Sequence, residues 1–184
     1  MPLIKLDHAG KKYLNRTFDL EINEKDFILV SGENGNGKTT LIHLLLGFTH
    51  PDLGTVQSKK LKIGYLPEKA MLPSFVPVMK YLETLSRIKK SKIDQKLLLE
   101  FNIPLFKSIH ELSKGNHQKL ALFSTFMGNP DLIILDEPLS GLDHEGAGML
   151  KKCLLKKKEE GLSIMISTHQ PEFFMEMANQ HLKL

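Results

Sequence analysis

Residues 32–39 read Gly-Glu-Asn-Gly-Asn-Gly-Lys-Thr, so three glycines precede or separate polar residues that end in a lysine and a hydroxyl. Glycines let a backbone curl around an anion with its amide N–H groups pointing inward. The Lys38 ammonium can then reach the β- and γ-phosphates of a polyphosphate, and the Thr39 hydroxyl can ligate Mg²⁺. The predicted phosphate-binding residues are Gly32, Glu33, Asn34, Gly35, Asn36, Gly37, Lys38, Thr39 and Thr40.

The segments on either side of this glycine loop supply the context in which such a loop binds phosphate. An apolar strand is predicted at 27–30, and an apolar helix pattern follows at 41–46. The helix N-terminus would add a partial positive charge at the loop. Strand, loop and helix together resemble a Walker A motif. The alternative, a glycine-rich turn that happens to contain lysine, is disfavoured by these flanking elements.

A second apolar run, residues 132–135, ends in Asp136 and Glu137. The run predicts a buried parallel strand, and ligands of open α/β sheets bind at the C-terminal edge of such strands. The pattern resembles a Walker B motif, in which Asp136 would hold Mg²⁺ and Glu137 would orient or deprotonate the attacking water. Two acids at a solvated strand end are the alternative, and the phosphate loop upstream weakens it.

Three further segments accompany these two motifs. Residues 112–119 read Leu-Ser-Lys-Gly-Asn-His-Gln-Lys, residues 140–143 read Ser-Gly-Leu-Asp, and His169 follows a predicted strand at 163–167. In this order they resemble the LSGGQ signature, the D-loop and the switch histidine of the ABC ATPase family. The resemblance covers nearly the whole chain, and the order of five motifs is more specific than any one of them.

The resemblance implies an α/β fold of the P-loop NTPase type in its ABC form. We expect a mostly parallel core sheet with flanking helices, a small antiparallel β layer, and a short helical subdomain at about 77–115 that ends at the signature. A single domain would cover residues 1–184, because a chain of 184 residues is too short for two ordinary domains. The cofactors would be ATP and Mg²⁺, and Lys38, Glu137 and His169 would be the catalytic residues of ATP hydrolysis.

In this family two copies pack head to tail around shared ATP. Ser113, Gly115 and Asn116 of one copy would then face the γ-phosphate bound by the other, with a helix N-terminus from about Asn116 adding positive potential. His169 would contact the γ-phosphate, and Asp143 would couple the two sites. Histidine is also common at strand ends as an ordinary polar cap, so the role of His169 depends on the other motifs.

Two positions depart from the commonest family pattern. Residues 63–68 resemble the Q-loop, but Glu68 replaces the glutamine that contacts Mg²⁺ and water; a glutamate can still ligate Mg²⁺. Ala9 stands where the family stacks an aromatic ring on adenine, and His8 or Tyr13 could substitute by stacking. Glu68 therefore leaves open a reduced turnover of ATP, and Ala9 leaves open a reduced selectivity for adenine.

The predicted function is an ATP-hydrolysing subunit of an ABC transporter, working as a homodimer or heterodimer beneath separate integral membrane subunits. The Leu-Pro-Glu and Ser-Lys-Gly variants resemble exporters of drugs, polysaccharides, antibiotics or sodium. Membrane subunits would dock near 68–79, where Pro73, Phe75, Val76 and Met79 are apolar; simple burial of these residues is an equal alternative. A soluble ABC-type ATPase that remodels a protein partner, or a weakly hydrolysing regulatory subunit, are the alternative functions.

Composition agrees with a protein kept in the cytoplasm. No apolar stretch approaches the ~20 residues that span a bilayer, and residues 1–10 lack the apolar core of a signal peptide. We expect a peripheral position at the cytoplasmic face of the membrane, held by membrane subunits. The complete motif set favours a minimal subunit over a fragment. A lone cysteine, Cys153, excludes an internal disulfide.

The net charge of +4 suggests nucleic acid, but its distribution does not. The lysines of 151–158 fall on a predicted amphipathic helix, and those of 89–92 fall at a predicted turn between helices. Neither group is interleaved with aromatics, as single-strand binding requires. We therefore expect no nucleic-acid partner, and a contact with anionic lipid headgroups remains open.

The remaining pattern predicts the order of the elements. Strands are expected at 4–6, 18–22, 55–57 and 61–66, with turns at 10–12 and 51–54, and helices at 78–88 and 93–101. A short last helix is expected after Pro171.

Overall fold

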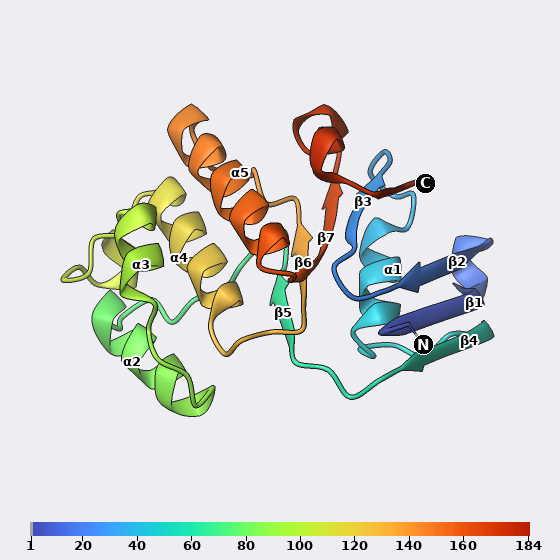
Figure 1. Cartoon of the computed structure of the whole chain (residues 1–184), viewed down its shortest axis with the longest axis horizontal. Helices are drawn as coiled ribbons and strands as arrows, with labels where there is room; N and C mark the ends of the chain where they lie inside the picture. The colour runs from blue at the N-terminus through green and yellow to red at the C-terminus, as the bar shows by residue number, and fades with distance from the viewer. Residues whose placement is uncertain (1) are drawn as a thin grey trace.

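Two β-sheets of different kinds organise the computed structural model, which describes residues 2–184 (Figure 1). The strands are β1 (Ile4–Lys11), β2 (Arg16–Ile22), β3 (Phe27–Ser31), β4 (Leu53–Ser58), β5 (Ile63–Leu66), β6 (Leu132–Asp136), β7 (Ser163–Thr168) and β8 (Gln180–Lys183). The helices are α1 (Lys38–Leu45), α2 (Val78–Ile88), α3 (Gln95–Phe101), α4 (Lys114–Phe126) and α5 (His144–Glu159). Short 3-10 turns are η1 (Lys12–Leu14), η2 (Ile109–Glu111), η3 (Pro171–Phe173) and η4 (Met175–Met177).

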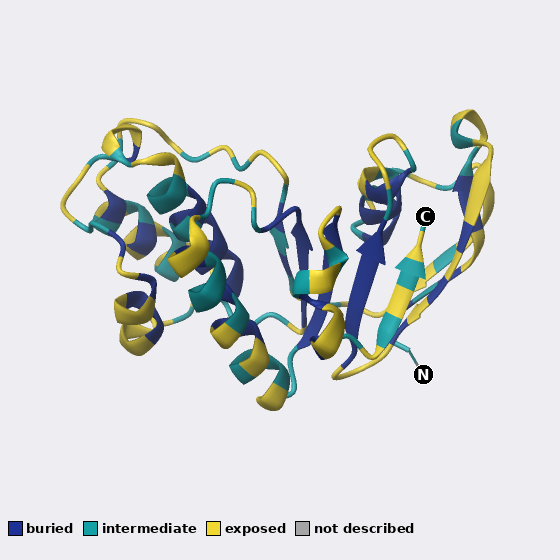
Figure 2. Ribbon diagram, turned by 90° about the horizontal axis from the view of Figure 1, so that it is seen from above, coloured by how far each residue is buried: buried dark blue, intermediate teal, exposed yellow. Residues whose placement is uncertain are grey.

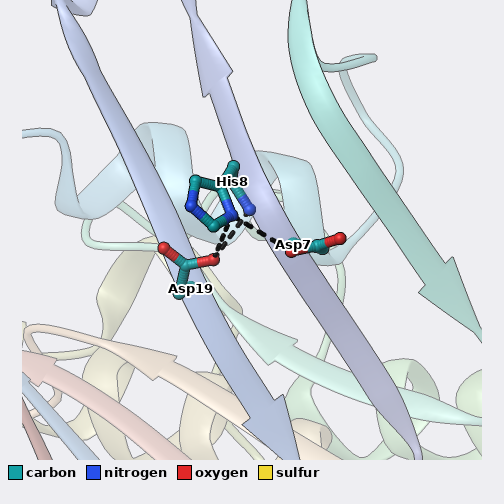
Figure 3. Close-up of side chains that lie close together, drawn as sticks. All are labelled: Asp7, His8 and Asp19. Carbon is teal, nitrogen blue, oxygen red and sulfur yellow. Dashed lines mark hydrogen bonds and ion pairs between the residues drawn. The ribbon is translucent and has the colours of Figure 1, made fainter.

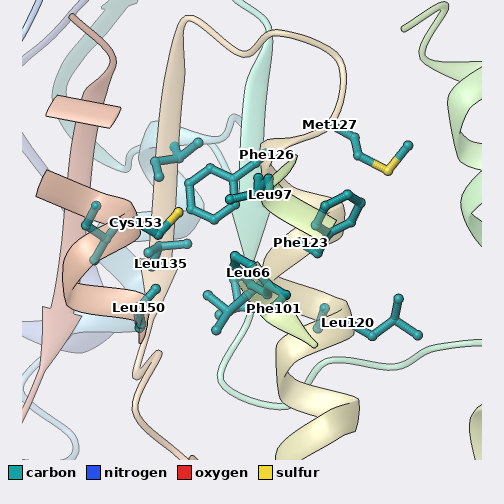
Figure 4. Packing of buried hydrophobic residues seen from close by; sticks show 14 of the residues in the cluster. Leu66, Leu97, Phe101, Leu120, Phe123, Phe126, Met127, Leu135, Leu150 and Cys153 are labelled. Carbon is teal, nitrogen blue, oxygen red and sulfur yellow. The ribbon is translucent and has the colours of Figure 1, made fainter. Parts of the chain in front are cut away.

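The larger sheet has five parallel strands in the order β5-β6-β7-β3-β8. Its central strands are buried on both faces, and successive side chains point to opposite faces. Phe27 and Leu29 of β3 therefore join one core, shared with α2 to α5, whereas Ile28 and Val30 join a second core with α1. Figure 4 shows the first core, where Leu135 and Leu66 come from neighbouring strands and the aromatic rings come from the helices.

The smaller sheet is antiparallel, in the order β2-β1-β4, and α1 lies between it and the parallel sheet (Figure 1). Its central strand β1 is irregular, because the pairing register shifts between Leu6 and Ala9. His8 lies in this irregularity with φ 47°, a left-handed conformation that non-glycine residues seldom adopt. The predicted antiparallel layer and the mostly parallel core sheet are thus confirmed.

Helices α2, α3 and α4 form a layer on the opposite side, at the left of Figure 1. The ring of Phe101 meets Phe123 and Phe126 edge to face, with centroids 5.8 and 6.3 Å apart. Lys89, which the sequence placed in a lysine-rich turn, donates from Nζ to the carbonyls of Ser124 and Met127 at 2.8 and 3.1 Å. This ammonium therefore caps the C-terminus of α4, and burial lowers its pKa.

Three local expectations were wrong. The turn expected at 10–12 begins later, because Gly10 pairs within β1; a Cβ there would lie 2.3 Å from the Arg16 carbonyl, so this glycine permits close strand pairing. The turn expected at 51–54 ends earlier, since Leu53 and Gly54 already belong to β4. After Pro171 two 3-10 turns replace the expected helix, and the edge strand β8 follows.

Among residues 2–184, no helix combines the length and apolar character that crossing a membrane requires.

Candidate nucleotide-binding site

The C-terminal edge of the parallel sheet opens into a cavity of about 580 Å³. Such an edge is where open α/β sheets bind ligands, because the loops after neighbouring strands diverge there. The loop between β3 and α1, the end of β6 and the end of β7 all contribute to it. The lining residues are Tyr13, Leu14, Asn34, Gly35, Gly37, Lys38, Thr39, Thr40, Glu68, Asp136, Glu137, Ser140 and His169.

The glycine loop is held in a conformation that requires glycine at its last turn. Gly37 precedes α1 with φ 94°, and a Cβ there would lie 2.6 Å from the Leu14 side chain. Lys38 is 7% exposed, and its Nζ donates to the carbonyls of Gly32 at 2.7 Å and Glu33 at 3.1 Å. The ammonium is thus fixed at the N-terminus of α1, where the loop amides and the helix dipole favour an anion.

Asp136 ends β6 and is almost fully buried. Burial raises the pKa of its carboxyl; the Ser167 hydroxyl, which donates to it, and the Lys38 ammonium act in the opposite direction. The carboxylates of Glu137 and Glu68 add to the rise. A bound cation would lower this pKa again, so the position suits a metal ligand.

Glu137 is strained and incompletely satisfied. Its backbone has φ 48°, which costs energy for a residue other than glycine, and its N–H donates to the Ser167 carbonyl at 2.9 Å. Oε2 lies 2.8 Å from His169 Nδ1, whereas Oε1 is buried without a hydrogen-bond partner among residues 2–184. A buried acceptor that no protein group satisfies suits a water or a ligand as its partner.

The oxygen donors of the cavity fit a magnesium ion. Thr39, Glu68 and Asp136 all line it, and Mg²⁺ prefers a hydroxyl, one or two carboxylates and phosphate oxygens. The Glu137 oxygen without a protein partner gives independent support for a polar occupant. Glu68 therefore lies where the sequence placed a metal ligand.

One of the two candidate aromatic residues reaches the cavity. Ala9 is fully buried in β1 and cannot contact a base. His8 faces outward between Asp7 and Asp19, with Nδ1 3.1 Å from an oxygen of each, and the hydrogen bond to Asp7 followed by the charge of Asp19 raises its pKa (Figure 3). Tyr13 lines the cavity, is 73% exposed, and its hydroxyl lies 3.4 Å from Thr40 Oγ1. Tyr13 is therefore the ring available for stacking.

The signature residues are not brought to this cavity. Ser113 caps α4, its hydroxyl accepting from the Asn116 N–H at 3.3 Å, and α4 begins at Lys114, two residues before the expected start. A Cβ on Gly115 would lie 3.3 Å from the Gly141 carbonyl, so the signature packs on the loop after β6. The signature residues therefore pack on the loop after β6 of the same chain, and they do not line the candidate nucleotide cavity.

The side chains of Gln118 and Asp143 hold the loop after β6 to two helices. Gln118 Nε2 donates to the Pro138 carbonyl at 3.2 Å and so ties α4 to the loop. Asp143 caps α5, accepting from the Gly146 N–H at 2.7 Å.

Several contributing residues were missed by sequence reasoning. Ser140 lines the cavity, Ser167 binds Asp136, and Arg16 donates from Nη1 to the Asn36 carbonyl at 3.1 Å. Ser167 could have been found, because it lies one residue before the end of β7, the strand beside β6, and pairs with Asp136 in register. Nothing in the sequence around Arg16 predicts its contact with Asn36, since this contact depends on how the two sheets are placed.

Known proteins resemble this chain in sequence. The family model described as ABC transporter matches residues 15–140. An uncharacterized ABC transporter ATP-binding protein of Methanocaldococcus jannaschii is 37% identical over 183 residues, covering 93% of this chain and 70% of that protein. The zinc import ATP-binding protein ZnuC of Wigglesworthia glossinidia brevipalpis is 36% identical over 152 residues, covering 80% of this chain and 65% of that protein. The chain spans between 62% and 76% of the length of these and similar curated relatives.

Solved structures resemble it in fold. A dimeric bacterial ABC transporter cassette gives a TM-score of 0.84 at 21% identity, over 98% of this chain and 94% of that one. A chain of a structure described as an inward-facing conformation of a "putative metal-chelate type ABC transporter" gives 0.84 at 24% identity, over 100% of this chain and 80% of that one.

Proposed function

The chain belongs to the ABC transporter family, and from this membership we propose that it is an ATP-binding and ATP-hydrolysing subunit of such a transporter. One observation carries the proposal: a single cavity collects the phosphate-loop lysine Lys38, the buried acid Asp136, and the incompletely satisfied acid Glu137. These are the groups that binding and cleaving a phosphoanhydride require.

The roles of the residues follow from their positions. The loop amides and Lys38 hold the β- and γ-phosphates, while Thr39, Asp136 and Glu68 hold Mg²⁺, which when bound neutralises charge on the phosphates. Glu137 Oε1 accepts a hydrogen bond from the attacking water and takes its proton. His169 Nδ1 lies 2.8 Å from the other oxygen, Oε2, and so holds the Glu137 carboxylate in place.

A second copy completes the site. Ser113, Gly115 and Asn116 lie apart from the cavity of their own chain, so they contribute to hydrolysis only by facing the phosphates held by another subunit. Two chains related head to tail would each supply one cavity and one signature. ATP would then join the two subunits, and its hydrolysis would release them.

The transporter's membrane subunits would dock near Glu68 to Met79. Met71 is 95% exposed and Phe75 is 86% exposed, with the Phe75 ring 5.2 Å from that of His110. Pro73 is exposed as well, whereas Val76 and Met79 are half-buried, so burial accounts for part of the predicted set but not for Pro73 and Phe75. A location at the cytoplasmic face of the membrane would follow from this docking.

The direction of transport is proposed from the names of relatives. The exporter branch was inferred from two short variants, at 66–68 and 113–115. Several relatives are named zinc import ATP-binding proteins, and they are 30 to 36% identical to this chain. We therefore propose import of a divalent metal ion such as zinc, in place of export.

The ATPase activity and the transported ion can both be tested with the purified chain and its membrane partners. We expect magnesium-dependent ATP hydrolysis that increases when the partners are reconstituted in vesicles, together with ATP-driven movement of ⁶⁵Zn²⁺ in the import direction. If ATP is hydrolysed neither with nor without the partners, the proposed ATPase activity is overturned. Hydrolysis without zinc movement would overturn only the cargo.

A further inference from the structure

The edge strand β8 lies beside β3, the strand that leads into the phosphate loop. The two strands are parallel and pair from Ile28 with Gln180 to Ser31 with Lys183. In Figure 2 the strand that runs to the C-terminus is teal and yellow beside a dark-blue neighbour, so its outer side faces solvent. The end of this exposed strand therefore meets the first residues of the loop.

A side chain of β8 contacts the residue that directly precedes the phosphate loop. His181 Nε2 lies 2.7 Å from the hydroxyl of Ser31, the residue directly before Gly32. Ser31 is 5% exposed, whereas His181 is exposed, so the ring connects the surface to a buried hydroxyl. A buried hydroxyl that loses its partner is costly, and this one can donate or accept, so the bond forms with either ring tautomer.

The backbone of Leu184 adds two more contacts to the same loop. Its N–H donates to the Ser31 carbonyl at 2.7 Å, and its carbonyl accepts from Asn36 Nδ2 at 3.1 Å. The approach is close, since a Cβ on Gly32 would lie 2.8 Å from the Leu184 carbonyl oxygen. The residue before the loop and a residue within it are thus tied to one segment, residues 181–184.

We propose that His181 is a positioning residue for the phosphate loop and that its side chain, together with the backbone of Leu184, sets the affinity of the site for nucleotide. The proposal rests on the proposed function, because it concerns the same cavity. Loop amides must converge before they bind phosphate, and a preformed loop avoids the cost of ordering them. His181 does not line the cavity, so its effect reaches the phosphates only through Ser31 and the loop.

This position predicts a particular kinetic signature. A looser loop weakens binding of ATP in the ground state and in the transition state alike, so KM rises while kcat changes little. Loss of one hydrogen bond to a buried group corresponds to a change of about three- to tenfold in affinity. Because the loop binds the phosphates that ADP shares with ATP, MgADP affinity should fall by the same factor.

The test compares His181→Leu with His181→Gln, which keeps a polar nitrogen or oxygen near the position of Nε2. Lys183→Ala is the matched control, because Lys183 lies on the same face of β8 and its side chain has no hydrogen-bond or ion-pair partner in the described chain. Calorimetric MgADP affinity, steady-state KM and kcat, and thermal unfolding are measured for each. We expect His181→Leu to weaken MgADP and raise KM by about three- to tenfold with kcat within twofold, and the other two variants to resemble wild type.

A double-mutant cycle with Ser31→Ala identifies the partner. If His181 acts through Ser31, the double variant His181→Leu/Ser31→Ala should bind MgADP no more weakly than the weaker single variant. Additive losses would overturn the assignment of Ser31 as the contact. A lower unfolding temperature with unchanged KM and MgADP affinity would overturn the positioning role, as would equal impairment of His181→Gln and His181→Leu.

The wild type separates this inference from the proposed function. If wild type binds and hydrolyses MgATP while His181→Leu matches it, the inference fails and the ATPase stands. If wild type binds no nucleotide, both fail together.

Discussion

The phosphate loop and the signature, the two regions proposed to contact the phosphates, are built in different ways. The phosphate loop forms part of a cavity of about 580 Å³, with Lys38 and Asp136 almost fully buried. The signature has exposed Ser113 at the start of a helix, where its side chain accepts from one N–H of the first turn, and Gly115 of that turn packs on Gly141. The phosphate loop lines a concave cavity, whereas the signature presents an exposed helix start.

This difference determines what a single chain can do. A concave site of loop amides, a lysine and carboxylates can bind a nucleotide without help. An exposed helix start attracts an anion weakly unless another surface closes over it. We therefore expect the monomer to bind ATP and expect hydrolysis to depend on a pair of subunits.

The largest effect is expected from Glu137→Gln. Removing the base at the cavity should lower kcat by about 10²- to 10⁴-fold, while MgATP binding persists because the loop is untouched. Sedimentation should then find monomers without nucleotide and dimers with MgATP. Wild-type turnover as slow as that of the variant would instead identify a regulatory subunit that barely hydrolyses, and a monomer under all conditions would show that a different subunit completes the site.

The separation of the two regions predicts complementation between variants. Lys38→Ala damages the cavity, and Ser113→Asp keeps a helix-capping side chain but turns a negative charge toward the phosphates. Each alone should lose most ATPase activity, by about tenfold or more. When the two variants are mixed in equal amounts, homodimers and mixed dimers form. Each mixed dimer has one intact cavity facing one intact signature, so activity should return in part. Ser113→Thr, which keeps the hydroxyl, is the control. If the mixture regains no ATPase activity, the proposed head-to-tail arrangement is contradicted.

The sequence predicted the cavity better than it predicted the contacts around it. Lys38, Asp136 and Glu137 were found because each lies at a fixed offset within one contiguous motif, and the parallel sheet was found because its strands are apolar on both faces. The strand β8 was missed, since Gln-His-Leu-Lys is short, polar at three of its four positions and exposed at every second one, as edge strands are.

Contacts between distant segments left no local signal. The bonds of Ser167 to Asp136 and of His181 to Ser31 join residues 31 and 150 positions apart, and they follow only from the strand order. The turn expected at 10–12 failed for a related reason: Gly10 serves pairing with two neighbouring strands, which local propensity does not encode.

A smaller effect should come from the link between the two regions. Gln118 is buried in the signature helix and donates to the Pro138 carbonyl, one residue beyond Glu137. Gln118→Leu leaves that carbonyl without its donor, and we expect about 1–3 kcal/mol lower stability by chemical denaturation. Lys119→Gln, at a half-buried neighbour, should change stability by less than about 0.5 kcal/mol. Unchanged stability of Gln118→Leu would mean that the regions are held together by packing alone.

The smallest effect separates two roles of Asp143, which lies between the regions. Its side chain caps α5 through the Gly146 N–H, so Asp143→Ala should cost about 1 kcal/mol, whereas Asp143→Ser should retain most of the cap. The family resemblance adds a coupling role across the dimer, and serine lacks the charge for it. If both variants hydrolyse ATP normally once the stability loss is compensated by lower temperature, Asp143 acts only as a cap. If Asp143→Ser is stable but loses activity, the residue couples the two cavities, because a cap that is intact cannot explain the loss.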